Sequence, residues 1–165
     1  MAEARRRWWW AWLGLSFAIV VADQLSKLAM IALFQPGEER VVTGFFSLVL
    51  AFNTGAAFSF LRDVALWPRY LFSAIAIAAG GLIVWLLRRG GDRLYCAGLA
   101  LILGGAAGNL WDRLTLGHVV DFLLFHWDRW YYPAFNIADS AITVGAALLI
   151  LDSFGRRRDR PEPER

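Results

Sequence analysis

Four long apolar segments constrain the fold of this chain more than any other feature of its sequence. About 20 mainly apolar residues, with a range of roughly 17 to 25, form a helix that crosses the hydrocarbon core of a bilayer. The pattern predicts an all-α membrane protein, a bundle of four transmembrane helices in one integral-membrane domain over residues 1–155, followed by a charged tail over 156–165. The four predicted spans cover residues 8–34, 70–87, 94–110 and 136–154.

The basic residues predict how the helices are oriented. Arginines gather in three blocks, at residues 5–7, 88–93 and 156–160. With four crossings all three blocks lie on one side of the membrane, which the positive-inside rule assigns to the cytoplasm. Both termini are then cytoplasmic, and the loops 35–69 and 111–135 lie on the outer side. A cleaved signal peptide is the alternative for the first segment, and it is disfavoured because its removal leaves an odd number of crossings.

The two outer loops are expected to differ in structure. Residues 41–52 are rich in β-branched and aromatic residues with a break at Gly44, which predicts short strands, a small sheet on the membrane surface. The second outer loop contains four aromatic residues of the kind that anchor proteins at the headgroup level, namely Trp127, Trp130, Tyr131 and Tyr132.

Composition and residue types argue against several other functions. The net charge is +3, but there is no basic stripe interleaved with exposed aromatics, so we expect no nucleic-acid binding. A single cysteine, Cys96, excludes an internal disulfide and a cysteine-rich metal site. His118 and His126 flank Asp121 but form no recognised zinc motif, so no metal is expected. Ser26 and Lys27 are adjacent and point to different helix faces, which weakens a Ser–Lys dyad.

Two aspartates on the outer side are the strongest candidates for chemistry, because ionisable groups at membrane depth are costly. Asp121 follows two valines, an apolar setting that raises the pKa of an isolated acid, and Asp139 falls in the first turn of the last segment. If they meet, they share one proton near neutral pH, and the pair can activate a water while polarising a peptide carbonyl. The structural alternative is that Asp139 only favours a helix N-terminus and Asp121 only ends a loop.

A second set of residues supports such a site. Asp23 and Lys27 are spaced i, i+4 and can form an ion pair on one helix face. Asn53 stands close to Gly55, where the backbone can approach a ligand. Arg113 can hold Asp112 or a backbone carbonyl.

Five sequence motifs, in order from residue 23 to 139, together resemble the lipoprotein signal peptidase family, also called signal peptidase II. Only the charged termini fall outside the resemblance. The motifs are Asp23-Gln24-Leu25-Ser26-Lys27, Asn53-Thr54-Gly55-Ala56-Ala57-Phe58, Gly104-Gly105-Ala106-Ala107-Gly108-Asn109-Leu110-Trp111-Asp112-Arg113, Val119-Val120-Asp121-Phe122 and Phe135-Asn136-Ile137-Ala138-Asp139.

The resemblance implies a multi-pass aspartyl endopeptidase of the bacterial inner membrane, with a small periplasmic β-cradle and its active site on the periplasmic side. It implies cleavage of diacylglyceryl-modified prolipoproteins before the lipidated cysteine, no cofactor or metal, contact with membrane lipid, and inhibition by cyclic peptides such as globomycin. A monomer is expected, since nothing requires a second chain. The implied catalytic pair is Asp121 and Asp139, and the implied substrate-binding or supporting residues are Asp23, Lys27, Asn53, Gly55, Gly105, Asn109, Arg113, Asn136 and Ala138.

Two other readings remain open at this stage. A small transporter or channel subunit would use the acids as an ion relay, but the inner halves of the helices carry almost no polar groups. An assembly factor would use the acids only to hold helices together, and replacing them would then reduce stability without abolishing any reaction.

Overall fold

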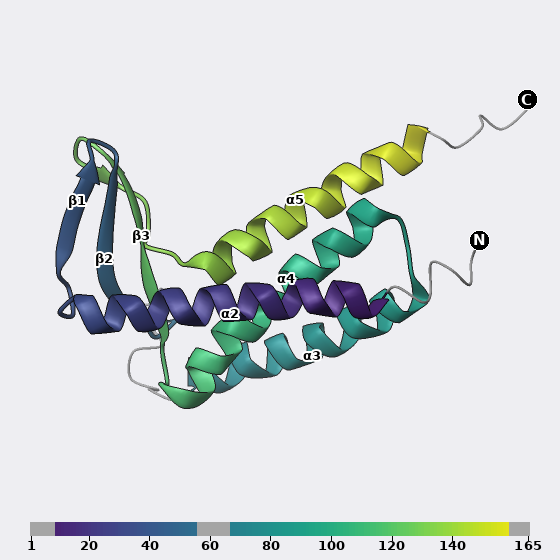
Figure 1. Cartoon of the computed structure of the whole chain (residues 1–165), viewed down its shortest axis with the longest axis horizontal. Coiled ribbons are helices and arrows are strands. Elements are labelled where there is room, and N and C mark those ends of the chain that lie inside the picture. The colour runs from purple at the N-terminus through teal and green to yellow at the C-terminus, as the bar shows by residue number, and fades with distance from the viewer. Residues whose placement is uncertain (1–8, 56–66, 159–165) are drawn as a thin grey trace, which may run out of the picture.

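The computed structural model of the chain describes residues 9–55 and 67–158. Four helices in this part are long and apolar enough to cross a membrane. A small antiparallel sheet projects beyond the bundle at one end (Figure 1). The predicted fold class is therefore confirmed. The helices are α2 (Trp9–Leu33), α3 (Trp67–Arg89), α4 (Arg93–Thr115) and α5 (Ile137–Arg158), and the strands are β1 (Glu39–Thr43), β2 (Phe46–Asn53), β3 (Val119–Trp127) and β4 (Trp130–Tyr131).

Helix α4 lies at the centre of the bundle, and small residues allow its neighbours to approach closely. A Cβ atom on Gly98 would come within 2.8 Å of the Gly145 carbonyl oxygen on α5. One on Gly104 would lie 2.7 Å from the Ser16 carbonyl oxygen on α2. Both distances are shorter than real Cβ contacts, so a larger residue at either glycine would push the backbones apart. Packing of this kind holds helices together where lipid removes the hydrophobic driving force.

Two helix ends differ from the boundaries expected from the sequence. Helix α4 continues to Thr115, five residues beyond the expected end, so Asp112 and Arg113 lie in a helix and not in an outer loop. Polar residues at this point predict the end of a span, but Asp112 is buried inside the bundle, where it has polar partners. Helix α5 includes Arg158, so only residues 159–165 of the expected tail follow it, and they lie outside the described residues.

The sheet has the strand order β1-β2-β3-β4, with β3 and β4 contributed by the second outer loop. Trp127, Trp130 and Tyr131 therefore belong to strands, and Tyr132 directly follows β4, which the sequence alone did not reveal. Strands β2 and β3 pair from Phe46 opposite Phe125 to Asn53 opposite Val119. Between Leu48 and Ala51 the register shifts, because three steps along β2 match two along β3. This bulge lies beside Asp121, the partner of Ala51.

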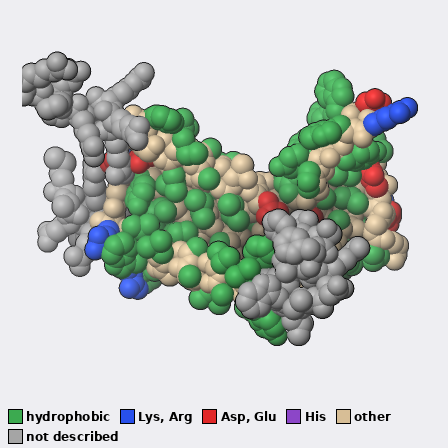
Figure 2. Space-filling view, turned by 180° about the vertical axis from the view of Figure 1, so that it is seen from behind, with side chains coloured by type: hydrophobic (Ala, Val, Ile, Leu, Met, Phe, Trp, Pro, Cys, Tyr) green, Lys and Arg blue, Asp and Glu red, His purple; other side chains and the backbone are tan. Residues whose placement is uncertain are grey.

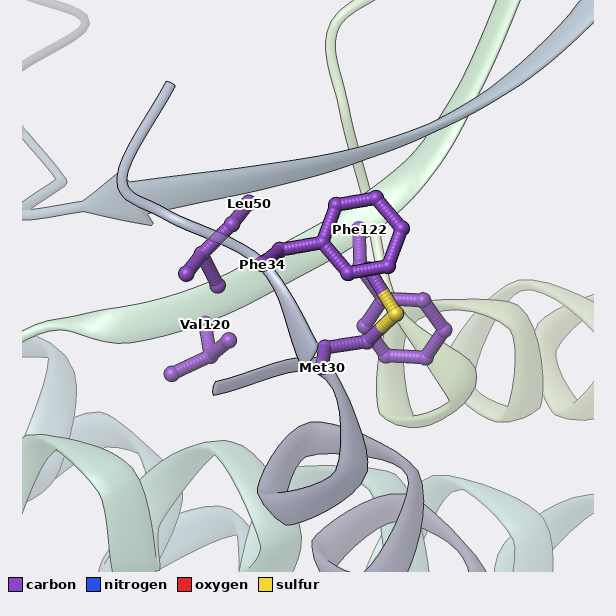
Figure 3. Close-up of a cluster of buried hydrophobic side chains, with 5 residues drawn as sticks. All are labelled: Met30, Phe34, Leu50, Val120 and Phe122. Atoms are coloured by element: carbon purple, nitrogen blue, oxygen red, sulfur yellow. The ribbon is translucent and has the colours of Figure 1, made fainter. Parts of the chain in front are cut away.

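A small apolar core fixes the sheet to the end of α2. Met30 in the last turn of that helix and Phe34 just after it pack against Leu50 of β2 and against Val120 and Phe122 of β3 (Figure 3). All five side chains are at least nine-tenths buried. Because Val120 and Phe122 flank Asp121 in sequence, this cluster also fixes the strand that carries the aspartate.

The two ends of the bundle differ in character. The start of α2, the connection between α3 and α4, and the end of α5 lie at the end opposite the sheet (Figure 1). We call this end the basic end, because Arg88, Arg89 and Arg93 lie there, and we call the opposite end the sheet end. Between them the helices expose large apolar side chains such as Phe17, Leu25 and Ile150, as a lipid-facing surface requires.

Candidate active site

A buried ion cluster joins α2 to α4 near the sheet end. The Nζ atom of Lys27 lies 2.7 Å from Asp23 Oδ2 and 2.8 Å from Asp112 Oδ2. All three side chains are almost completely buried. One lysine between two carboxylates leaves a net negative charge, so the cluster needs further donors to be stable.

Those donors come from the residues that surround the two proposed catalytic positions. Asp23 Oδ1 accepts the Ala138 backbone N–H at 2.9 Å, and Asp112 Oδ2 accepts the Val120 N–H at 3.1 Å. Ala138 directly precedes Asp139, and Val120 directly precedes Asp121. The ion cluster therefore holds the backbone beside each aspartate of the proposed pair.

The Asp121 carboxylate is buried in β3 and accepts two amide hydrogen bonds. Asn136 Nδ2 donates to Oδ1 at 2.7 Å, and Asn53 Nδ2 donates to Oδ2 at 3.0 Å. Loss of hydration through burial, with repulsion from Asp139, raises the pKa of the Asp121 carboxyl to about 6, although the two amides and Lys27 oppose the shift. The Asp121 carboxyl is therefore poised to hold or release a proton near neutral pH.

Asp139 forms a reciprocal cap at the start of α5 with Asn136. The Asn136 Oδ1 atom accepts the Asp139 N–H at 2.9 Å, and Asp139 Oδ2 accepts the Asn136 N–H at 3.3 Å. This is a capping box with aspartate at its third helical position. The helix-start role considered from the sequence is thus present, and the Asp139 side chain is only partly buried.

Two asparagines connect the aspartates to each other and to the ion cluster. Asn136 binds both acids, through its amide to Asp121 and through the cap to Asp139. Asn109 Nδ2 donates to Asp139 Oδ1 at 2.7 Å, while its Oδ1 accepts from Lys27 at 3.1 Å and from Asn136 at 3.2 Å. The two acids are thus separated by one shared asparagine, and their charges repel each other.

The remaining residues named from the sequence lie around this network. Gly55 adopts a φ of 77°, which favours glycine, and donates its N–H to Asn53 Oδ1 at 2.9 Å. A Cβ on Gly105 would overlap the Ala138 carbonyl oxygen. Arg113 donates a hydrogen bond to the Asn109 carbonyl at 3.3 Å. Asp112 and a backbone carbonyl were the two partners expected for Arg113, and the structure shows the carbonyl. All eleven residues are brought to the sheet end.

The surface above this network is hollowed. Figure 2 shows a depression between the helices and the sheet, with acidic side chains near its floor and apolar side chains on both sides.

The alternatives based on histidine and serine find little support in the geometry. His118 packs against Phe52 with tilted rings and 4.4 Å between the ring centroids. His126 stacks on Tyr131 at 5.5 Å and is hydrogen-bonded to Ser47 Oγ at 3.0 Å. Ser26 Oγ donates to the Asp23 carbonyl at 2.8 Å and is not hydrogen-bonded to Lys27.

Three residues of the network are not among the site residues expected from the sequence. Asp112 is as buried as Asp23 and completes the ion cluster. Gln24 Nε2 donates to Asp112 Oδ1 at 2.8 Å. Gly108 leaves room for Asp23, since a Cβ there would lie 2.6 Å from its Oδ2. All three belong to the motifs quoted above, and an acid in an apolar segment was the available signal for Asp112.

Comparison with known proteins gives the family. The family model described as "Signal peptidase (SPase) II" matches residues 15–155. The chain belongs to the signal peptidase II family. As a member of that family it is a peptidase, and its four apolar helices make it a multi-pass bacterial membrane protein.

Relatives and solved structures agree with this signal peptidase II assignment. The chain is 54% identical to proteins named "Lipoprotein signal peptidase" from Ralstonia nicotianae and Burkholderia ambifaria, over 89% of its length and 86% and 89% of theirs. It superposes on a solved structure described as a bacterial membrane enzyme with a TM-score of 0.78 and 25% identity, covering 94% of both chains. A second structure with the same description gives a TM-score of 0.75 at 26% identity, covering 87% of this chain and 92% of the other.

Proposed function

We propose that this enzyme removes the signal peptide from diacylglyceryl-modified prolipoproteins, cutting before the lipidated cysteine, with Asp121 and Asp139 as its catalytic pair. The observation that carries the proposal is the pair of acids on different elements, linked through Asn136 and held by a buried ion cluster. The name shared by its relatives supports the substrate class.

The chemistry follows from one proton shared by the two acids. The ionised carboxylate takes a proton from a water molecule, and that water attacks the scissile carbonyl carbon. The protonated carboxyl donates a hydrogen bond to the carbonyl oxygen, where negative charge develops. A raised pKa at Asp121 supports this division, because one acid of the pair then stays protonated near pH 6. The two acids titrate as a unit, so the proposal gives neither role to a named aspartate.

The location of the site fits a substrate that arrives within the bilayer. A lipid-anchored peptide keeps its scissile bond near the headgroups, and the proposed pair lies at the sheet end of the helices (Figure 1). We infer that this end faces the periplasm and that both termini are cytoplasmic, since the basic connection between α3 and α4 lies at the opposite end. Water is available there for hydrolysis.

The sheet limits how a peptide strand can bind. Both edges of β2 are occupied, by β1 and by β3, so an extended peptide cannot pair along that strand. Backbone contacts near Asp121 are therefore expected at the end of β2, from Asn53 to Gly55. Substrate binding that is unchanged in Gly55→Ala would contradict this part of the proposal.

The test uses purified protein in detergent and a diacylglyceryl-modified prolipoprotein. Asp121→Asn and Asp139→Asn should each abolish cleavage while the protein remains folded by circular dichroism. Asp139→Asn is informative because an asparagine Oδ1 still accepts the Asn136 N–H of the cap. Asp128→Asn makes the same change on an exposed turn and should cleave normally. Cleavage retained in both site variants would favour a purely structural role for the acids.

Two further expectations accompany this proposal. A cyclic peptide such as globomycin should inhibit cleavage by occupying the same depression. The bound peptide should also protect the carboxyl groups of the site from chemical modification. The enzyme should act as a monomer, so specific activity should not depend on protein concentration in detergent.

A further inference from the structure

A second unusual cluster lies at the basic end of the bundle, opposite the proposed catalytic pair. A cavity of about 520 Å³ opens between the start of α2 and the end of α3. In the part of the chain that the structure describes, its lining residues are two tryptophans and two arginines: Trp9, Trp85, Arg88 and Arg89. None of these residues takes part in the network around the aspartates.

The two arginines lie over the two indole rings. The guanidinium carbon of Arg89 is 3.7 Å from the centroid of the Trp85 ring, and that of Arg88 is 5.0 Å from the Trp9 ring. A guanidinium group that lies over an aromatic ring contacts the ring with its flat face. Its N–H groups, which point outward in its own plane, stay available for another partner. The indoles therefore position the cations without consuming their hydrogen-bonding capacity.

The charge of this cluster is not balanced by ion pairs that the structure shows. Among the described residues the ion pairs are those of Lys27 and Arg40, and neither Arg88 nor Arg89 takes part in one. Residues 88–93 contain three arginines and one aspartate, so the connection is positive. Basic side chains are visible at this end of the molecule in Figure 2.

The position of the cavity indicates the kind of anion that fits it. Arg88 and Arg89 are exposed in the last turn of an apolar, membrane-length helix, where the headgroup phosphates of a bilayer lie. Guanidinium groups bind phosphate oxygens in a bidentate manner. The indole walls are apolar, which suits the glycerol backbone and the first acyl carbons better than a free, fully hydrated ion.

We propose that this cavity binds an anionic phospholipid, with its phosphate between Arg88 and Arg89 and its upper acyl chains along Trp9 and Trp85. The site is separate from the proposed peptidase site and does not depend on its chemistry. It would attach the α2–α3 side of the bundle to the leaflet at the basic end.

The experiment measures lipid retention by the full-length protein in detergent, using native mass spectrometry. Phosphatidylglycerol, phosphatidylcholine and inorganic phosphate are each titrated as probes. Each arginine near an anionic headgroup contributes about fivefold in affinity, so Arg88→Gln with Arg89→Gln should weaken phosphatidylglycerol binding roughly 30-fold. Arg129→Gln removes a similar charge from the exposed turn at the sheet end and should leave binding unchanged.

The outcomes separate the alternatives. Tight phosphatidylglycerol binding that is lost in the double variant and kept in Arg129→Gln supports the proposal. Equal retention of phosphatidylcholine would overturn it, as would phosphatidylglycerol binding that is the same in all three proteins. Displacement of the lipid by millimolar inorganic phosphate would overturn the lipid assignment in favour of a phosphate-ion site. Cleavage by the double variant in neutral detergent should match wild type, which verifies that it is folded.

Discussion

Replacing Asp121 by asparagine should change how the stability of the protein depends on pH. Burial raises the pKa of this carboxyl from 3.8 to about 6 in the folded state. Between these values the folded protein binds more protons than the unfolded chain, so stability rises as the pH falls through this window and is lost as the pH rises through about 6. The full shift corresponds to about 3 kcal/mol, and the part gained between pH 8 and pH 5 to about 1.4 kcal/mol.

The assay compares the free energy of unfolding of wild type and Asp121→Asn in mixed micelles at pH 5 and pH 8. The absolute difference at one pH is less informative, because the new amide would face the donor amides of Asn53 and Asn136 and lose a hydrogen bond worth about 1–3 kcal/mol. The change in this stability difference between pH 5 and pH 8 isolates the titration of Asp121. Wild type should gain about 1.4 kcal/mol more than the variant on acidification. Asp128→Asn should behave as wild type, and parallel pH dependences for wild type and Asp121→Asn would refute the reasoning.

Three further predictions concern activity and packing. The value of kcat/KM for a lipidated precursor should fall with rising pH above about 6, as the aspartate pair loses its shared proton, and a stopped assay from pH 5 to 9 checks this. Gly105→Ala should destabilise the protein by about 1–3 kcal/mol, because its Cβ would overlap the Ala138 carbonyl, whereas Gly81→Ala on open helix surface should be neutral or stabilising in the same thermal melts. Lys27→Met should cost about 3–5 kcal/mol, because it leaves two buried carboxylates without their cation; unchanged folding yield would contradict the assigned ion cluster.

The sequence predicted those features that depend on local patterns. Apolar length gave the four helices, and the i, i+4 spacing of Asp23 and Lys27 gave their ion pair, which the structure contains. The end predicted for the third span, residue 110, lies five residues before the end of α4, because a polar residue in an apolar segment can either end a span or face the interior of the bundle. Asp112 looked like the end of a span, but it faces the interior, where it binds Lys27.

Features that depend on contacts between distant segments could not be predicted from local sequence patterns. Residues 119–127 were expected to be loop, but they pair with β2 through a register containing a bulge, which no local pattern encodes. The link from Asp112 to the Val120 N–H likewise requires knowing which helix face meets which strand. The catalytic roles of Asp121 and Asp139 came from the family resemblance and remain predictions.

The reciprocal cap between Asn136 and Asp139 has a consequence for biogenesis. One acid of the proposed pair, and the asparagine that connects it to the other, are contributed by the start of the final helix. A ribosome-bound chain that has inserted its first three helices therefore contains only one acid of the proposed catalytic pair. Proteolytic competence should arise only when the last span enters the bilayer, so an incompletely synthesised molecule remains inert toward the precursors around it.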